Sequence, residues 1–360
     1  MKLESESIAV QKRIRHKKIT MIFILAVLTA AAAVLCLFTG SSGMSVRDGM
    51  DALAHRGSPV NIRILWNIRV PRIMAALTAG AGLSVSGLIM QAVLNNPMAS
   101  PATLGVSNAA VFGANLSIIA FAGGFLSTGH NVSNYTAGVN PYASSLIAFL
   151  FSILSVLIVV ELCRVRSFSP NVVVLAGISM GSVWNAGTTI LQFYATDVGL
   201  SAAVIWTFGD LGRATYRTDW IMLAAAALGI FYFQRMSWRY NALQSGDAAA
   251  MSMGINVELL RGISMLLASL ITAVCVSFLG IIGFIGIICP HSVKKLMGQD
   301  FRFSTPASAL AGSLLLLLAD TLSRSMGGGS ALPVGAITTL LGAPFFIIII
   351  FSERKGSCGC

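Results

Sequence analysis

Long apolar runs separated by short polar segments constrain this chain more than any other feature. A bilayer core about 30 Å thick needs roughly 20 apolar residues for each helical crossing. Only 10% of the 360 residues are charged, well below the roughly 25% of soluble domains. The sequence therefore predicts an all-α polytopic membrane protein with ten transmembrane helices. The ten segments lie at about residues 19–38, 73–94, 102–122, 145–163, 172–194, 220–234, 259–279, 281–293, 307–323 and 334–351.

The first apolar run follows a basic stretch, KRIRHKK, at residues 12–18. A signal peptide has the same order of regions, but this run is longer than a typical one and no A-x-A-like cleavage site follows it. We expect it to be retained as the first transmembrane helix. The predicted organisation is a basic cytoplasmic tail at 1–18, one transmembrane domain at 19–351 and a cytoplasmic tail at 352–360.

The run from Leu259 to Val293 decides whether the number of crossings is even. Its 35 residues would make one helix of about 52 Å, and Gly280, Gly283 and Pro290 offer places to turn. Ten crossings with a cytoplasmic N-terminus put 16 of the 24 Lys and Arg residues on the cytoplasmic side, whereas one crossing here leaves 12 on each side. Because cytoplasmic loops are enriched in positive charge, we expect ten crossings and two cytoplasmic termini. The net charge of +11 follows from these helix ends and predicts no nucleic-acid partner.

Small and polar residues form a stripe on one face of three predicted helices. Small residues let helices approach closely in lipid, so we interpret the glycines as packing positions. Asn185 and Gln192 are amides in hydrocarbon that need partners or water, and they are equally consistent with packing and with a translocation pathway. The stripes are Gly80, Ser84, Gly87 and Gln91 in the second helix, Gly181, Asn185, Thr188 and Gln192 in the fifth, and Gly335, Thr339 and Gly342 in the tenth.

Charged residues inside the apolar segments are few. Asp320 and Arg324 are spaced i, i+4, which favours a local ion pair, and Glu161 precedes Arg164 at a helix end. We found no carboxylate alone in the middle of a segment, where a proton-coupled carrier needs one. This distribution argues against a secondary transporter.

Metal and catalytic chemistry have little support. Cys289 and His291 lie close together, but no second histidine or carboxylate stands at ligand spacing, and zinc needs three or four ligands. We interpret His291 as structural, and Cys358 and Cys360 as part of a solvated tail. The sequence predicts no metal site, no catalytic residue and no enzymatic activity.

One cytoplasmic loop, LQSGDAAAMSMG at residues 243–254, contains a short helix-forming segment bounded by Gly246 and Gly254. We expect Asp247 to cap this helix, which is suited to docking a soluble partner or to forming a simple surface helix. The chain lacks the phosphate-binding pattern GxxxxGK[ST]. If ATP powers the protein, another polypeptide hydrolyses it.

Four ordered motifs resemble the FecCD/BtuC-type permeases of ABC transporters, which import iron siderophores, haem or vitamin B12. The resemblance runs from about residue 20 to residue 351. The motifs are RVPR with GAGLSVSGLIMQAVLNNPMASPATLGVS at 69–72 and 80–107, LQSGDAAAMSMG at 243–254, GIIGFIGIICPHSVKKLMGQDFR at 280–302, and ADTLSR with LPVGAITTLLGAPFF at 319–346.

The resemblance implies ten helices per subunit and a homodimeric or closely paired permease core in the bacterial cytoplasmic membrane. Two cytoplasmic ABC ATPase subunits would bind the ATP, so this chain needs no cofactor, and an extracytoplasmic binding protein would deliver the substrate. The cargo we expect is a ferric siderophore or similar metal chelate, with haem or cobalamin as the alternative within the family and a secondary transporter as the alternative outside it.

The resemblance also implies roles for particular residues. Arg69, Arg72 and Arg324 match the contacts to the binding protein and fall on the predicted outer side, where exposed arginines pair with carboxylates. The family's ATPase-coupling element matches Gly246, Asp247, Ala250 and Gly254. The fifth and tenth helices match those that line the central cavity, which implicates Asn185, Thr188, Gln192 and Thr339. The departures are Gln244 and Ser245 before the coupling turn, Lys294 in place of an arginine, and a longer loop at 123–143.

Overall fold

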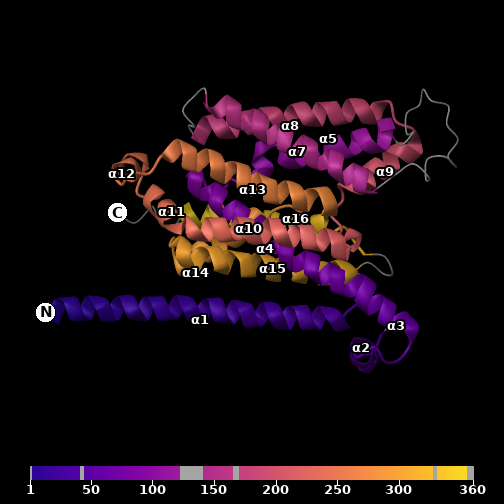
Figure 1. Ribbon diagram of the computed structural model, residues 1–360, viewed down its shortest axis with the longest axis horizontal. Helices are drawn as coiled ribbons and strands as arrows, with labels where there is room; N and C mark the ends of the chain where they lie inside the picture. The colour runs from indigo at the N-terminus through magenta and orange to yellow at the C-terminus, as the bar shows by residue number, and fades with distance from the viewer. Residues whose placement is uncertain (1, 41–43, 122–140, 165–169, 327–330, 355–360) are drawn as a thin grey trace.

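The computed structural model describes residues 2–40, 44–121, 141–164, 170–326 and 331–354. These residues form a bundle of roughly antiparallel helices (Figure 1). The α-helices are α1 (Lys2–Phe38), α2 (Val46–Leu53), α3 (Pro59–Arg63), α4 (Val70–Val93), α5 (Val106–Asn115), α7 (Pro141–Arg164), α8 (Pro170–Phe193), α9 (Asp197–Thr207), α10 (Tyr216–Arg235), α11 (Ser237–Leu243), α12 (Asp247–Ser252), α13 (Val257–Leu279), α14 (Ile285–Met297), α15 (Phe301–Met326) and α16 (Val334–Arg354). Short π-helical segments are η1 (Ile64–Arg69) and η3 (Leu116–Phe121), and short 3-10 helices are η2 (Pro101–Leu104) and η5 (Leu211–Arg213).

Helix α4 occupies the centre of the bundle, where it contacts α10, α13, α14 and α15. Its glycines create the close approaches. A Cβ on Gly87 would lie 1.7 Å from the carbonyl oxygen of Gly286 in α14, and a Cβ on Gly80 would lie 2.5 Å from that of Gly312 in α15. Contacts this short leave no room for any side chain. The interpretation of these stripe glycines as packing positions is therefore confirmed.

Each of the ten predicted apolar segments coincides with a helix or a helix followed by a short turn. Within the described residues, six helices are long and apolar enough to cross a membrane alone, and α10 joined to α11 through a 59° bend makes a seventh candidate. The α5–η3 segment, α14 and the described apolar part of α16 are shorter. The polytopic all-helical fold is thus confirmed, whereas the count of ten crossings stays a prediction.

The run at 259–293 reverses direction. Helix α13 ends at Leu279, and Gly280 takes a positive φ of 79° before α14 begins at Ile285. Arg261 near the start of the run donates a hydrogen bond to the carbonyl of Val93, and Lys294 just after its end donates to Gln91. Both ends of the run therefore lie beside the same end of α4, as expected of a helical hairpin.

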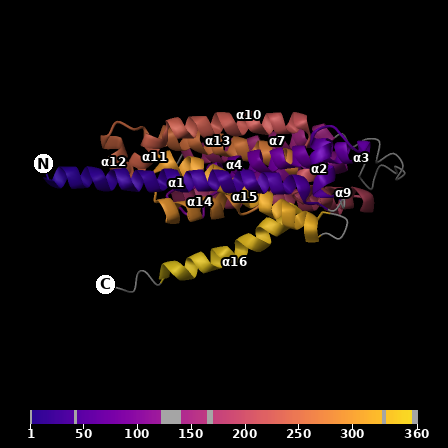
Figure 2. The same ribbon diagram turned by 90° about the horizontal axis from the view of Figure 1, so that it is seen from below.

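Two helices lie at the edges of the bundle. Helix α1 packs mainly on α15 and runs without a break from Lys2, so the predicted tail at 1–18 continues the first helix from its second residue. Helix α16 contacts α14 and α15 near its start and then leaves the bundle (Figure 2). The start of α1 and the α11–α12 turn lie at one end of the molecule, and α2, α3 and α9 lie at the other (Figure 1).

Candidate functional site: a coupling turn and an outer arginine cluster

The turn before α12 depends on glycine. Gly246 has φ of +100° and Gly254 has φ of +79°, a region that side chains disfavour. A Cβ at either position would meet no atom within 4 Å, so backbone conformation alone requires glycine here. Gly246 is also the N-cap of α12 and Asp247 is the first helical residue, with no side-chain cap. The expectation that Asp247 caps the helix is wrong.

Asp247 instead forms an ion pair with Arg261 of α13. The two Nη atoms of Arg261 donate to the two carboxylate oxygens of Asp247 at 2.8 and 2.9 Å, and its Nε donates to the Val93 carbonyl at 2.8 Å. The Arg261 side chain is 6% exposed and that of Asp247 is 48% exposed. Bidentate charged hydrogen bonds are strong and directional. They therefore join α12 to α13 and, through Val93, to the C-terminal end of α4.

Two exposed methionines lie at the C-terminal end of α12. Ala250 is fully buried beneath the helix, whereas Met251 is 57% exposed and Met253 is 63% exposed. Methionine side chains adapt to uneven partner surfaces. The short helix therefore presents an adaptable apolar surface on a base fixed by the Asp247–Arg261 pair.

At the opposite end of the bundle, Arg69, Arg72 and Arg324 lie close together, and we call them the outer arginine cluster after the side of the membrane that the sequence predicts for them. Arg72 Nε donates to Asp320 Oδ1 at 2.6 Å, and Arg72 Nη2 donates to Asp210 Oδ1 at 3.2 Å. Arg324 Nε lies 3.0 Å from Asp320 Oδ2, which confirms the predicted i, i+4 ion pair. The cluster thus connects the start of α4 with η5 and α15.

The burial of this cluster differs from the expectation of exposed docking residues. Arg69 is 4% exposed and Arg72 is 8% exposed, and the Arg324 side chain is 10% exposed. Arg69 Nη1 donates to the Leu37 carbonyl, and Arg324 Nη1 donates to the Thr39 carbonyl at 2.9 Å. The three arginines lie close together, which the sequence did not predict, and their role in docking stays a prediction. In this conformation their hydrogen bonds connect the elements at this end of the bundle.

The predicted pathway residues have different surroundings. Asn185 is exposed and lines a cavity of about 340 Å³ between α8 and the η2–α5 segment. The Gln192 amide donates to Asn115 at 3.0 Å, and Thr188 is 5% exposed and bonds its own helix. Thr339 is exposed on α16 and donates to the Gly335 carbonyl. The stripe on α8 is therefore split, with Thr188 packed inside and Asn185 on the surface.

Sequence reasoning missed two functional candidates. Arg261 stands 14 residues from Asp247, beyond any helical spacing that would reveal the pair. Asp219 lies one residue before the predicted segment 220–234. It is fully buried, and neither carboxylate oxygen accepts a hydrogen bond within the part of the chain described. A buried carboxylate is therefore present in the first turn of α10, just before the predicted apolar segment.

Among the described residues, no group of three or more His, Cys, Asp or Glu side chains is arranged to hold a metal ion. Cys289 is buried, and His291 lines a cavity of about 540 Å³ near Gln91 and Lys294. The C-x-C pair at 358 and 360 and most of the 123–143 loop lie outside the described residues.

Comparison with known proteins identifies the family. The model of the FecCD transport family matches residues 25–352. A Methanocaldococcus jannaschii protein assigned as an ABC transporter permease is 43% identical over 340 residues, covering 94% of this chain and 96% of that protein. The vitamin B12 import permease BtuC of Shigella boydii is 31% identical over 341 residues, covering 95% and 98%.

The fold agrees with this match. A solved structure of a transporter assigned to the metal-chelate type of ABC transporters, in an inward-facing conformation, superposes with a TM-score of 0.79. It is 26% identical, and the match covers 92% of this chain and 99% of that one. Family model, relatives and fold agree over nearly the whole chain, and we conclude that this protein belongs to the FecCD transport family and is a membrane permease subunit of an ABC importer.

Proposed function

We propose that this permease is driven by separate ATPase subunits that dock on α12, and that it imports a ferric siderophore or similar metal chelate. The observation that carries the proposal is the Asp247–Arg261–Val93 connection, because it joins an exposed cytoplasmic helix to the central helix of the bundle. A push on α12 is transmitted to α13 and α4 without passing through flexible loops. Such rigid-body rocking is a common means of switching between two states.

The faces of α8 and α16 support a paired core. Helix α8 contacts α5, α7 and η2, whereas α16 contacts α14 and α15. Asn185 and Thr339 therefore belong to separate parts of one subunit, and a second copy would bring such surfaces together around a central path. We propose that Asn185, Gln192 and Thr339 line that path, and that Thr188 supports α8 from inside.

We further propose that the binding protein docks on the outer end of the bundle, with the outer arginine cluster beneath it. Because the three arginines are already paired, their first role is to hold the docking surface in shape. Arg56 and Arg63 in the α2–α3 region are exposed, so they are available for carboxylates on a docking lobe. Arg69, Arg72 and Arg324 can reach such carboxylates only after the outer end opens.

The cargo assignment rests on the family as a whole. One relative is named for vitamin B12 import, and the solved relative is assigned to metal chelates. These cargoes are large organic chelates of a metal, and we propose a ferric siderophore with cobalamin or haem as the alternative. The purified partner binding protein tests this choice directly, since retention of a corrinoid or haem in place of a ferric chelate would refute it.

Reconstitution with the ATPase and binding-protein partners tests the coupling role. Asp247→Lys should abolish uptake while ATP hydrolysis continues, because it puts two cations together at the base of α12. Glu258→Lys is the matched control. Glu258 is exposed in the first turn of α13, so this substitution makes the same charge reversal outside the Asp247–Arg261–Val93 connection. Wild-type uptake by Asp247→Lys would contradict the role. Uptake that stops with an uncoupler while ATP persists would indicate a secondary carrier.

A further inference from the structure

Helix α1 packs against the α14–α15 region through apolar side chains in its middle. Nearer its N-terminus, at the end of the bundle that carries α12, a pocket separates α1 from this region. Met21, Ile22 and Leu25 of α1 pack against Val293, Met297 and Ala307. One turn further toward the N-terminus, the two surfaces separate and leave a pocket of about 800 Å³. The pocket therefore lies at the edge of the bundle, with α1 as its outer wall.

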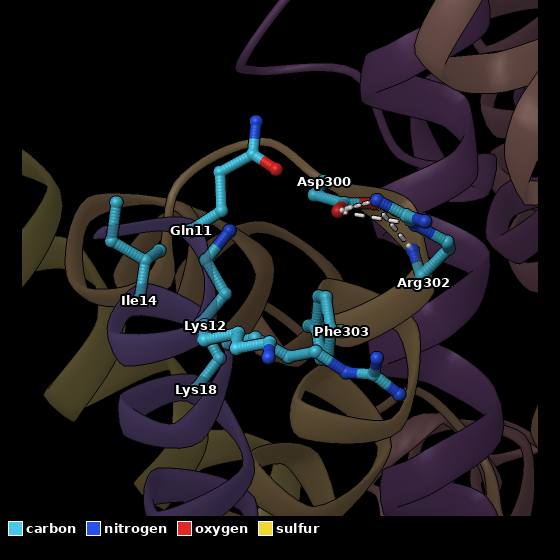
Figure 3. A pocket seen from close by; sticks show the side chains of 8 residues that line it. Gln11, Lys12, Ile14, Lys18, Asp300, Arg302 and Phe303 are labelled. Atoms are coloured by element: carbon cyan, nitrogen blue, oxygen red, sulfur yellow. Dashed lines mark hydrogen bonds and ion pairs between the residues drawn. The ribbon is translucent and has the colours of Figure 1, made fainter. Parts of the chain in front are cut away.

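The lining of this pocket is strongly basic. Four cationic side chains and one carboxylate line it, which gives a net formal charge of +3. Lys12 and Lys18 extend from α1 on one side of the pocket, and Phe303 and the Asp300–Arg302 pair lie on the other (Figure 3). Lys18 Nζ lies 5.4 Å from the centre of the Phe303 ring. The cationic residues are Lys12, Arg15, Lys18 and Arg302, and the carboxylate is Asp300.

The carboxylate does not neutralise the α1 cations. Asp300 accepts from Arg302 Nη2 at 2.8 Å and from the Asn241 amide at 3.0 Å. Burial alone would raise the pKa of Asp300, but the hydrogen bonds from Arg302 and Asn241 lower the pKa to about 2. Asp300 is thus ionised and paired with Arg302, and Lys12, Arg15 and Lys18 are left to face an anion from outside the chain.

The pocket continues into an apolar surface. Ile14 lines the pocket and is 50% exposed. Further along α1, Ile19 is 46% exposed and Phe23 is 68% exposed. In a membrane permease, such a surface on a peripheral helix faces acyl chains. An anionic group above an apolar strip is the chemical pattern of a phospholipid, and basic pockets between transmembrane helices bind anionic headgroups.

We propose that this pocket binds the headgroup of an anionic phospholipid, with its acyl chains lying along α1. The phosphate would accept from Lys12, Arg15 and Lys18, while Arg302 stays paired with Asp300. The bound lipid would fix residues 11–18 of α1 to the α14–α15 turn. The proposal requires membrane insertion, but it does not depend on the cargo or on the docking role of α12.

The test uses the purified full chain, with bound lipids counted by native mass spectrometry and melting temperatures measured in detergent. Phosphatidylglycerol is compared with phosphatidylcholine and with inorganic phosphate. The pocket variant is Lys12→Gln with Arg15→Gln. The matched control is Arg13→Gln with Lys17→Gln, which removes the same charge from exposed positions of α1 that do not line the pocket.

We expect phosphatidylglycerol to bind and to raise the melting temperature of the wild type and of the control. One basic residue near an anionic surface contributes about fivefold in affinity, so the pocket variant should bind about 30-fold more weakly. Equal loss in the pocket variant and the control would overturn the proposal in favour of general surface charge. A rise in melting temperature with inorganic phosphate but not with phosphatidylglycerol would overturn the assignment to a lipid. Equal binding of phosphatidylglycerol and phosphatidylcholine would overturn the assignment to an anionic headgroup.

Discussion

The Asp247–Arg261 ion pair makes the sharpest energetic prediction. Breaking a buried ion pair costs about 3–5 kcal/mol, whereas exposed pairs are worth about 0–1 kcal/mol. Arg261 is 6% exposed and Asp247 is 48% exposed, so solvent screens one partner only. We therefore expect an interaction energy of about 1.5–2 kcal/mol between these two side chains.

A double-mutant cycle measures this energy. Asp247→Asn, Arg261→Gln and the double variant remove the charges and keep the shapes, and reversible unfolding in mixed micelles gives each change in unfolding free energy. The pair Glu161–Arg164 is the control, because both side chains are 64% exposed at a similar distance of 2.8 Å. Its cycle should give about 0.5 kcal/mol or less. Equal interaction energies in the two cycles would refute the claim that the α12 connection is rigid.

Other predictions follow from the packing and the charges. Gly87→Ala should lower the unfolding free energy by about 1–3 kcal/mol in the same unfolding assay, because its Cβ would lie 1.7 Å from a backbone oxygen; an unchanged value would contradict the close helix contact. Arg72→Glu should reduce the yield of folded protein, because it adds a carboxylate beside two others, whereas Arg63→Glu should keep the yield and weaken binding-protein docking in a pull-down assay. Asp300 has a depressed pKa of about 2, so its stabilising contribution is present above its unfolded pKa and is lost as the pH falls through about 2. Melting temperatures of the wild type and Asp300→Asn should accordingly differ by a constant amount between pH 5 and 8, and a difference that vanishes within this range would be contrary to the assigned ionisation.

The sequence was sufficient to locate the long apolar helices, because each crossing needs a long apolar run and each run has to satisfy its own backbone hydrogen bonds. The shorter helices α2, α3 and α9 lie between the predicted segments and were not predicted. It also located the reversal after Leu279, since glycine permits the positive φ at Gly280. The first helix extends further than predicted. Apolar length defines only the part in lipid, whereas Lys and Arg residues continue a helix equally well in water.

The arginine cluster shows where local reasoning stops. The family resemblance implies an exposed docking role for Arg72, yet its partners Asp210 and Asp320 are 138 and 248 residues away. No periodicity in the sequence connects them. Only the packed bundle brings α4, η5 and α15 close enough to bury the charges together, and the pairing of Asp247 with Arg261 escaped prediction for the same reason.

The central claim is that the coupling turn and the α2–α3 region lie on opposite sides of the membrane. A cysteine is introduced at the exposed position Ser245 or Ser58 after Cys358 and Cys360 are replaced by serine. The other four cysteines, Cys36, Cys163, Cys275 and Cys289, are buried, and the parent protein without the introduced cysteine is the control for their labelling. The introduced cysteine can be labelled in intact cells with a maleimide that does not cross membranes. We predict rapid labelling of Ser58→Cys and none of Ser245→Cys until the membrane is opened. Labelling of both positions from outside, or of neither, would contradict the topology on which the transport mechanism and its power source depend.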